Sequence, residues 1–296
     1  MQKIVPHLWF DKEAVEAAKF YTAVFPECEI NYQTVIKNTP SGDCEIVSFK
    51  IKGYEFMSLS AGPLFKFNPS ISFMVNIDPS KSKSAKKNLD TLWESLSEGG
   101  KTLMPLGKYP FSDRYGWVED QFGVSWQLIL TDAKGEGRPF IVPTFLFVGE
   151  VCGRAEEAMA FYRSVFSRSK QGVVVHYSEG SEPDVEGSVK YCDFMLENQW
   201  FAAMDSAQEH KFGFNEAISF IVHCRNQQEI DYHWAKLSFD PQAERCGWLK
   251  DKFGVSWQIV PANMRELMEK NPRKTTPAML KMKRIIIKDL EMAGRG

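Results

Sequence analysis

The pattern of apolar and polar positions divides the chain into two halves with the same order of predicted elements. In residues 12–25 of the first half, Val15, Ala18 and Tyr21 recur with the spacing of one helix face. On either side of residues 52–53, apolar and polar side chains alternate with a period of two, which predicts a β-hairpin. In order, the patterns of this half predict a strand, a helix, a hairpin, a strand, a helix and three strands at residues 4–10, 12–25, 44–60, 70–77, 83–100, 101–106, 114–120 and 124–130.

The second half repeats the first most clearly at one motif. The segment GWVEDQFGVSWQL begins at Gly116 and GWLKDKFGVSWQI begins at Gly247, and nine of the thirteen positions are identical. Gly123 in this motif favours a turn, because glycine adopts backbone conformations that are costly for other residues. In the strand that follows, Trp126 is predicted to face the core and Gln127 the opposite side. Shorter matches, such as KFYTAVFP with AFYRSVFS, keep the same order, as expected for two homologous domains.

The second half is shorter than the first and continues into a separate segment. Phe73 and Gly116 lie 43 positions apart, whereas their counterparts Phe220 and Gly247 lie 27 positions apart, so one strand or one hairpin is predicted to be missing. A Gly-rich, charged segment separates the halves. The last segment is Met-rich, basic and helical in pattern, and its apolar side chains are expected to dock on the body of the protein or on a partner subunit. We therefore predict a first domain, a linker, a second domain and a helical tail at residues 1–132, 133–141, 142–261 and 262–296.

Composition excludes several classes of protein. A hydrophobic content of 44%, a charged content of 25% and a net charge of −2 are typical of a globular protein without general attraction to nucleic acid or membranes. The six cysteines form no CxxC pair and are predicted to be free thiols in a reducing compartment. Because no apolar stretch is long enough for a membrane span or a signal-peptide core, we expect a cytoplasmic protein. No aromatic residues are interleaved with the basic residues of the tail, so no nucleic-acid partner is expected.

Several motifs resemble a known superfamily. The segments FDKEAVEAAKFYTAVFP and DQFGVSWQL, each with a counterpart in the second half, resemble the vicinal oxygen chelate (glyoxalase/bleomycin resistance/dioxygenase) superfamily. Within it, FKFNPSISFMV, GFNEAISFIV and the tail PAMLKMKRIIIKDLEMA resemble the PhnB-like group, whose domains carry the label 3-demethylubiquinone-9 3-methyltransferase. The resemblance implies an α+β fold of two tandem domains, each of paired βαβββ modules that form curled mixed sheets, with a C-terminal helical tail. It also implies cup-shaped sheets that hold a metal or a small molecule.

A cup with apolar walls and a few placed polar groups in each domain is expected to bind a small molecule. In metal-binding members of the superfamily, the last strand of the cup carries a glutamate near the positions that Gln127 and Gln258 occupy here. An uncharged carboxamide at this place favours ligand binding through hydrogen bonds. The candidate ligand-binding residues are Trp9, Ser58, Ser72, Phe73, Gln127, Phe147, Ser219, Phe220, His223 and Gln258.

The alternative is a metal-dependent lyase, isomerase or dioxygenase that works through His7 and Gln127. Catalytic divalent sites usually need at least three good protein donors. In the first half, the positions that match the family's ligands offer one imidazole, that of His7. We therefore expect a small-molecule-binding protein without a strong catalytic metal. The methyl transfer in the family label has no support from the residues, because no glycine-rich turn follows a predicted strand.

The tandem arrangement carries an expectation about assembly. Two homologous domains in one chain can form within that chain the contact that separate subunits would make, so an intramolecular pseudo-dimer is predicted, with a homodimer as a further option. The shortened second half, with Thr144 at the position of His7, leaves open a third interpretation, in which one half only completes the pseudo-dimer.

Overall fold

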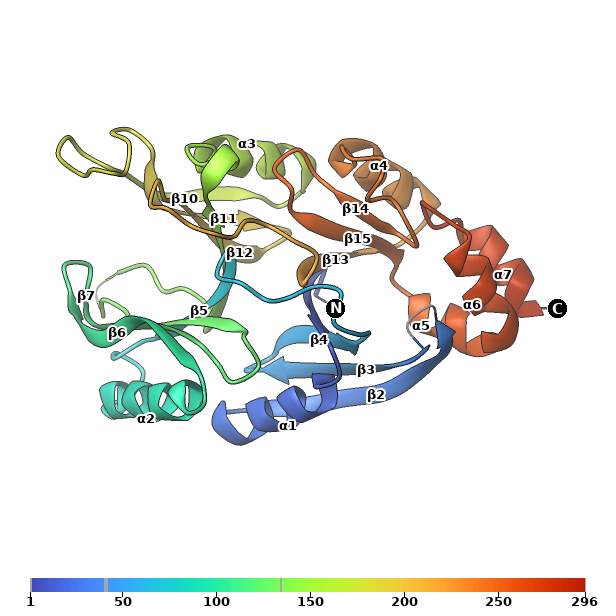
Figure 1. Ribbon diagram of the computed structural model, residues 1–296, viewed down its shortest axis with the longest axis horizontal. Helices are drawn as coiled ribbons and strands as arrows, with labels where there is room; N and C mark the ends of the chain where they lie inside the picture. Colours follow the sequence, from blue (N-terminus) through green and yellow to red (C-terminus); the bar gives the residue numbers. More distant parts are fainter. Residues whose placement is uncertain (1, 40–41, 134, 296) are drawn as a thin grey trace.

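The computed structural model describes every residue except 1, 40–41, 134 and 296, and its first half contains two βαβββ modules (Figure 1). Module 1 consists of β1 (Ile4–Phe10), α1 (Ala14–Val24), β2 (Cys28–Thr39), β3 (Gly42–Ile51) and β4 (Tyr54–Ser60). Module 2 consists of β5 (Ile71–Ile77), α2 (Ala85–Ser97), β6 (Lys101–Tyr109), β7 (Ser112–Glu119) and β8 (Ser125–Leu130). The order of strand, helix and three strands that the resemblance implies is confirmed in both modules, although no segment predicted from the patterns corresponds to β2.

The second half repeats this plan with one element fewer. Module 3 consists of β9 (Ile141–Phe147), α3 (Ala155–Val165), β10 (Lys170–His176), β11 (Val189–Leu196) and β12 (Gln199–Asp205), with a short 3₁₀ turn before α3. Module 4 consists of β13 (Ile218–Cys224), α4 (Gln227–Leu237), β14 (Trp248–Lys250) and β15 (Ser256–Pro261). Residues 218–261, all of which are described, include no counterpart of β6, so the predicted loss of one strand is confirmed.

Each sheet combines strands from both halves. Sheet A joins modules 1 and 4 in the order β14-β15-β13-β1-β4-β3-β2, and sheet B joins modules 3 and 2 in the order β10-β11-β12-β9-β5-β8-β7-β6. The junctions are antiparallel: β1 pairs with β13, and β5 pairs with β9. The sequence patterns did not show this exchange. A cup therefore draws one module from each half.

The two modules within one half meet through their helix-covered faces, where a buried aspartate organises the core. Tyr21 of α1 donates a hydrogen bond to Asp120 Oδ2 at 2.8 Å, and Trp126 Nε1 donates to the same oxygen at 2.9 Å. The backbone N–H groups of Phe122 and Val124 donate to Asp120 Oδ1. Burial raises the pKa of Asp120 to about 6, although these donors act in the opposite direction.

The second half builds the same arrangement from the repeated motif. Tyr162 of α3 donates to Asp251 Oδ2 at 2.7 Å and Trp257 Nε1 donates at 2.8 Å. The repeated Asp, Gly and Trp of the motif are therefore explained by one turn, whose aspartate joins the last strand of one module to the helix of the other.

The tail forms three helices, α5 (Met264–Lys270), α6 (Pro272–Leu280) and α7 (Ile287–Arg295), which lie beyond the ends of β15 and β2 (Figure 1). The segment between α6 and α7 follows the edge of module 4: Cys246 N–H donates to Met282 O and Gly247 N–H donates to Lys283 O, both at 2.7 Å. The tail therefore covers the edge at which a counterpart of β6 would lie. Within the described ranges, no helix is both long enough and apolar enough to span a membrane.

Candidate functional site

Side chains on the central strands alternate between the helix-covered face and the opposite, concave face of each sheet. On the concave face of sheet A, His7 of β1 lies opposite Ser219 of β13, and Ser219 lies opposite Ser256 of β15. Gln258 of β15 donates from Nε2 to Ser219 Oγ at 3.0 Å. All four side chains are at most 8% exposed, so the Gln258 amide and the His7 imidazole do not extend into bulk water. We call these four residues the polar row of sheet A.

Two atoms of the polar row are buried without a hydrogen-bond partner among the residues that the structure describes: His7 Nδ1 and Ser256 Oγ. We call them the open polar atoms. They lie two strands apart, roughly 10 Å at the usual strand spacing. Burial lowers the pKa of His7 to about 3, so the imidazole is neutral near pH 7 and each ring nitrogen is a donor or an acceptor according to the tautomer.

Apolar side chains flank the polar row. The Trp248 ring makes edge contacts with His7 at 5.6 Å and with Trp9 at 6.1 Å between centroids. Further along the same three strands, Val5, Ile221 and Val260 form a buried cluster against which Met57 and Met264 pack. A few polar groups between aromatic and aliphatic walls are the usual composition of a small-molecule site.

The concave face of sheet B carries the repeated residues with their hydrogen bonds complete. Gln127 is 1% exposed; it donates from Nε2 to Ser72 Oγ at 2.8 Å and accepts from the Tyr115 hydroxyl at 2.7 Å. Trp117 Nε1 donates to Ser125 Oγ, also at 2.7 Å. The rest of this face is filled by a buried cluster of Met74, Val142, Trp200 and Ala202.

Two changes in the repeat account for the difference between the faces. Cys246 stands at the position of Tyr115, so module 4 offers no phenol to Gln258. Trp248, the counterpart of Trp117, contacts the His7 ring and supplies no hydrogen bond to Ser256. Ser256 and Trp248 were not among the predicted site residues, although both belong to the repeated motif.

The structure corrects the expected pairing of His7 with Gln127. His7 belongs to β1 in sheet A and Gln127 belongs to β8 in sheet B, so the two residues face different cups. The partner of His7 within its own cup is Gln258, from the other half of the chain. The expected metal pair is therefore wrong.

Four candidate ligand-binding residues also lie on the helix-covered face and not in a cup. Ser58 donates to Val47 O, and the rings of Phe73, Phe147 and Phe220 pack against Trp126, Phe214 and Trp257, respectively. Ser72 and Phe73 are neighbours in one strand, as are Ser219 and Phe220, so period-two alternation prevents both members of a pair from facing the cup. Trp9, Ser219, His223 and Gln258 lie on the concave face of sheet A, and Ser72 and Gln127 lie on that of sheet B.

The donors on the concave faces do not fit a divalent metal ion. Sheet A offers two imidazoles, His7 and His223, but the apolar pair Val5 and Ile221 lies between them. The remaining donors of the polar row are neutral hydroxyl and amide oxygens, and the positions beside His7 on β4 are Met57 and Leu59. Across the described residues, no three His, Cys, Asp or Glu side chains come together. Stable divalent sites need more anionic or imidazole donors than this set supplies.

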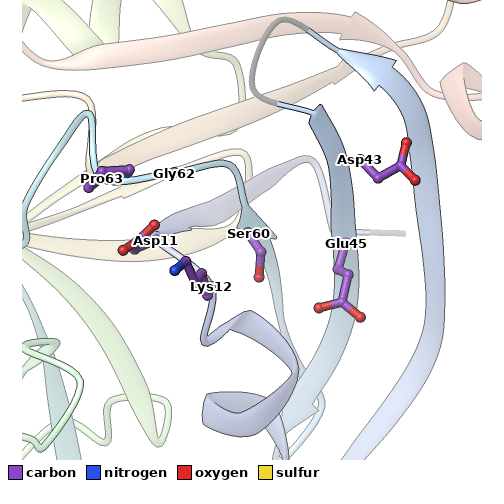
Figure 2. Close-up of a pocket in the computed structure, with 7 residues that line it drawn as sticks. All are labelled: Asp11, Lys12, Asp43, Glu45, Ser60, Gly62 and Pro63. Carbon is purple, nitrogen blue, oxygen red and sulfur yellow. The ribbon is translucent and has the colours of Figure 1, made fainter.

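Two surface cavities lie away from the polar row. The first, about 370 Å³ in volume, is lined by Asp11, Lys12, Asp43, Glu45, Ser60, Gly62 and Pro63 (Figure 2). Ser60 accepts a hydrogen bond from Ala14 N–H, which places this cavity beside the start of α1 on the helix-covered side. The second, about 420 Å³, is lined by residues of α2, β6 and β7, including Trp93 and Arg114. Charged side chains dominate the first cavity, so it is a weaker candidate for a ligand site than the polar row.

Comparison with solved structures defines the class of the fold. Glyoxalase I from Zea mays shares 12% sequence identity, covers 90% of this chain and 96% of its own, and superposes with a TM-score of 0.53. A Bacillus subtilis protein at 10% identity covers 86% of this chain and 84% of its own, with a TM-score of 0.51. The chain thus has the α+β, glyoxalase-like fold of the vicinal oxygen chelate proteins, as predicted.

The family match is more specific. The family described as 3-demethylubiquinone-9 3-methyltransferase matches residues 2–129 and again residues 139–260, so the chain belongs to this family as a tandem duplication. The PhnB protein from Bacillus cereus shares 36% identity over 44% of this chain and all of its own, with a TM-score of 0.39. Comparison with curated proteins gave no match.

Proposed function

We propose that the concave face of sheet A binds a small, uncharged organic molecule that makes hydrogen bonds to the open polar atoms. The observation that carries this proposal is the presence of two buried polar atoms, His7 Nδ1 and Ser256 Oγ, without a partner in the described parts of the chain. Leaving a polar group buried and unpaired costs about 1–3 kcal/mol, and a ligand that satisfies both atoms removes that cost. The aromatic wall of Trp9 and Trp248 favours a ligand with a flat apolar portion.

Charge also selects the ligand. The polar row contains no ionised side chain, because burial keeps His7 neutral near pH 7. An ionised ligand would lose its hydration without gaining a counter-charge, so an amide, an alcohol or a phenol is favoured over a carboxylate or an amine. Methyl transfer is not part of this proposal, since the family description is its only support.

A fragment screen tests the proposal. Uncharged aromatic amides and phenols, observed by ligand-detected NMR, are expected to bind the wild-type protein and to lose binding in His7→Leu and in Ser256→Ala. The matched controls are Thr144→Val and Ser125→Ala, which change the same positions of the repeat on sheet B. Binding that is lost equally in the control variants, or no binding by any such fragment, would contradict the proposal.

Metal analysis tests the alternative. The donor set predicts no stoichiometric zinc, nickel, manganese or iron in protein purified without an affinity tag. A stoichiometric metal that disappears in His7→Ala would replace the binding proposal by the metal-dependent enzyme, with Gln258 in place of Gln127 as the second ligand.

A further inference from the structure

The polar row has no open route from solvent. His7, Ser219 and Ser256 are 4%, 0% and 1% exposed, so a ligand reaches them only when a covering element moves. The strands of sheet A are fixed by continuous ladders and by the aromatic core beneath them. Side chains of the sheet itself, such as Trp248 on β14, cover part of the row. A larger opening requires the movement of a segment that lies on the concave face without belonging to the sheet.

The tail meets this description at its first helix. The α5 residue Met264 packs on the cluster of Val5, Ile221 and Val260, which forms one wall of the site. Met264 also belongs to the apolar cluster of the tail itself, around Leu267. One side chain thus connects the core of the tail to the wall of the site.

The tail reaches from one edge of sheet A to the other. Beside β14 it accepts the backbone hydrogen bonds of Cys246 and Gly247. Across the cup, the Arg265 guanidinium lies 4.8 Å from the centre of the Tyr32 ring on β2, the opposite edge strand, and α6 also contacts β2. Figure 1 shows α5 between β15 and β2, with α6 and α7 beyond it.

The attachments of the tail are weaker than those of a strand. Gln227 on α4 clamps it through two hydrogen bonds, to Ile285 O and from Ile287 N–H. The methionine-rich cluster joins the tail helices to one another, because all its members lie within residues 264–290. Other attachments to the body include the two backbone hydrogen bonds beside β14, the packing of Met264 on the wall of the site, and partly exposed ion pairs such as Arg284 with Asp231. Methionine side chains repack at low cost, and exposed ion pairs contribute little, so local detachment requires much less free energy than unfolding of the sheet.

We propose that the tail, residues 262–295, is a detachable cover of the sheet A site and that ligands enter when α5 leaves the concave face. This inference rests on the proposed function for the identity of the site. The family match ends at residue 260, so the resemblance of the tail segment PAMLKMKRIIIKDLEMA to this group is not part of that match, and the cover lies outside the matched residues. Among the more extensive contacts between described elements, none joins these helices to sheet B, so the cover is assigned to the cup of sheet A.

Chemical modification of His7 tests the cover without a ligand. Diethyl pyrocarbonate reacts with neutral imidazole, and mass spectrometry of peptides reports each histidine separately. Leu267→Ala removes a buried side chain from the tail cluster without touching the wall of the site, and Gln227→Ala removes the clamp on α4. In both variants the rate of modification of His7 is expected to rise about tenfold or more. The rate of modification of His176, on the exposed strand β10, is expected to stay unchanged.

The matched control is Leu89→Ala, which removes an equally buried leucine from α2, far from the tail. It separates local detachment from general loss of stability. If His7 reacts no faster in Leu267→Ala than in Leu89→Ala, the cover is excluded and another segment controls access. Faster reaction of His7 without any fragment binding would support the cover and refute the proposed function, whereas binding without this acceleration would do the reverse.

Discussion

On the concave face of sheet B, Tyr115, Gln127 and Ser72 form a continuous chain of hydrogen bonds, and Trp117 satisfies Ser125. On sheet A, the same repeat leaves His7 Nδ1 and Ser256 Oγ open within the described chain. The cores beneath the two faces are nevertheless built alike. Both halves therefore keep the aspartate that joins their two modules, whereas the groups on the two concave faces differ.

The largest effect is expected where the two halves are alike. Asp120→Ala and Asp251→Ala each leave a buried tyrosine hydroxyl and a tryptophan N–H without an acceptor. Each substitution is expected to lower the free energy of unfolding by about 3–5 kcal/mol, measured by urea denaturation. A large loss in one variant and a negligible loss in the other would show that the cores differ as well as the faces.

The next largest effect is a loss of folding stability at acidic pH, which is expected from His7 on sheet A and not from Thr144 at the same position of sheet B. Burial lowers the pKa of His7 to about 3 in the folded protein, whereas the ordinary imidazole pKa of about 6.5 applies to the unfolded chain. Between these values the unfolded chain binds the extra proton, so stability falls as the pH falls. The slope is half of its full value at pH 6.5 and approaches about 1.4 kcal/mol per pH unit below that, which gives a loss of about 2 kcal/mol between pH 6.5 and 4.5.

His7→Leu is expected to remove this loss, and Thr144→Val is expected to retain it; urea denaturation at the two pH values measures both. The raised pKa of Asp120 acts in the opposite direction, but it is common to both variants and cancels in the comparison. Equal acid sensitivity in the two variants would show that His7 is not the group that titrates.

A smaller effect is expected from the phenol that only sheet B possesses. Tyr115→Phe leaves Gln127 Oε1 buried without its donor and is expected to cost about 1–3 kcal/mol of unfolding free energy. Cys246→Ser, at the corresponding position of module 4, is expected to change stability by less than half of that. If Tyr115→Phe left the free energy of unfolding unchanged, water would replace the hydroxyl, and the concave face of sheet B would be more hydrated than its burial indicates.

The smallest effect compares the two serines of the motif. Ser125→Ala removes the acceptor of Trp117 Nε1 and is expected to cost about 1 kcal/mol. Ser256→Ala removes one of the open polar atoms and is expected to leave the ligand-free protein unchanged or slightly more stable. Thermal unfolding of the two variants measures both effects. A larger loss of stability in Ser256→Ala than in Ser125→Ala would show that the Ser256 hydroxyl has a hydrogen-bond partner.

Sequence patterns predicted the order of elements, the missing strand and the repeat, because amphipathic spacing and a duplicated motif are local properties. They could not predict which module would share a sheet with β1, since that choice depends on how the two halves pack. For this reason His7 was paired with Gln127 and not with Gln258.

Some errors were avoidable from the sequence. Phe73 and Phe220 follow Ser72 and Ser219 directly, so alternation alone excludes them from the same face. The aspartate of the repeated motif and the tyrosine of the repeated FY pair were also visible in both halves. The contact between this tyrosine and this aspartate was not visible from the sequence, because the two residues lie about a hundred positions apart and only the packing of the modules brings them together.

The exchange of strands between the halves determines what a cut chain would do. A fragment ending near residue 132 would retain its aspartate-centred core but would expose the unpaired sides of β1 and β5. Two such fragments could satisfy each other by pairing these edges, as separate subunits. A pair of identical subunits would form two identical cups. Because the two halves belong to one chain and differ in sequence, the two cups can differ: one can have a cover, and the other can be filled by its own side chains.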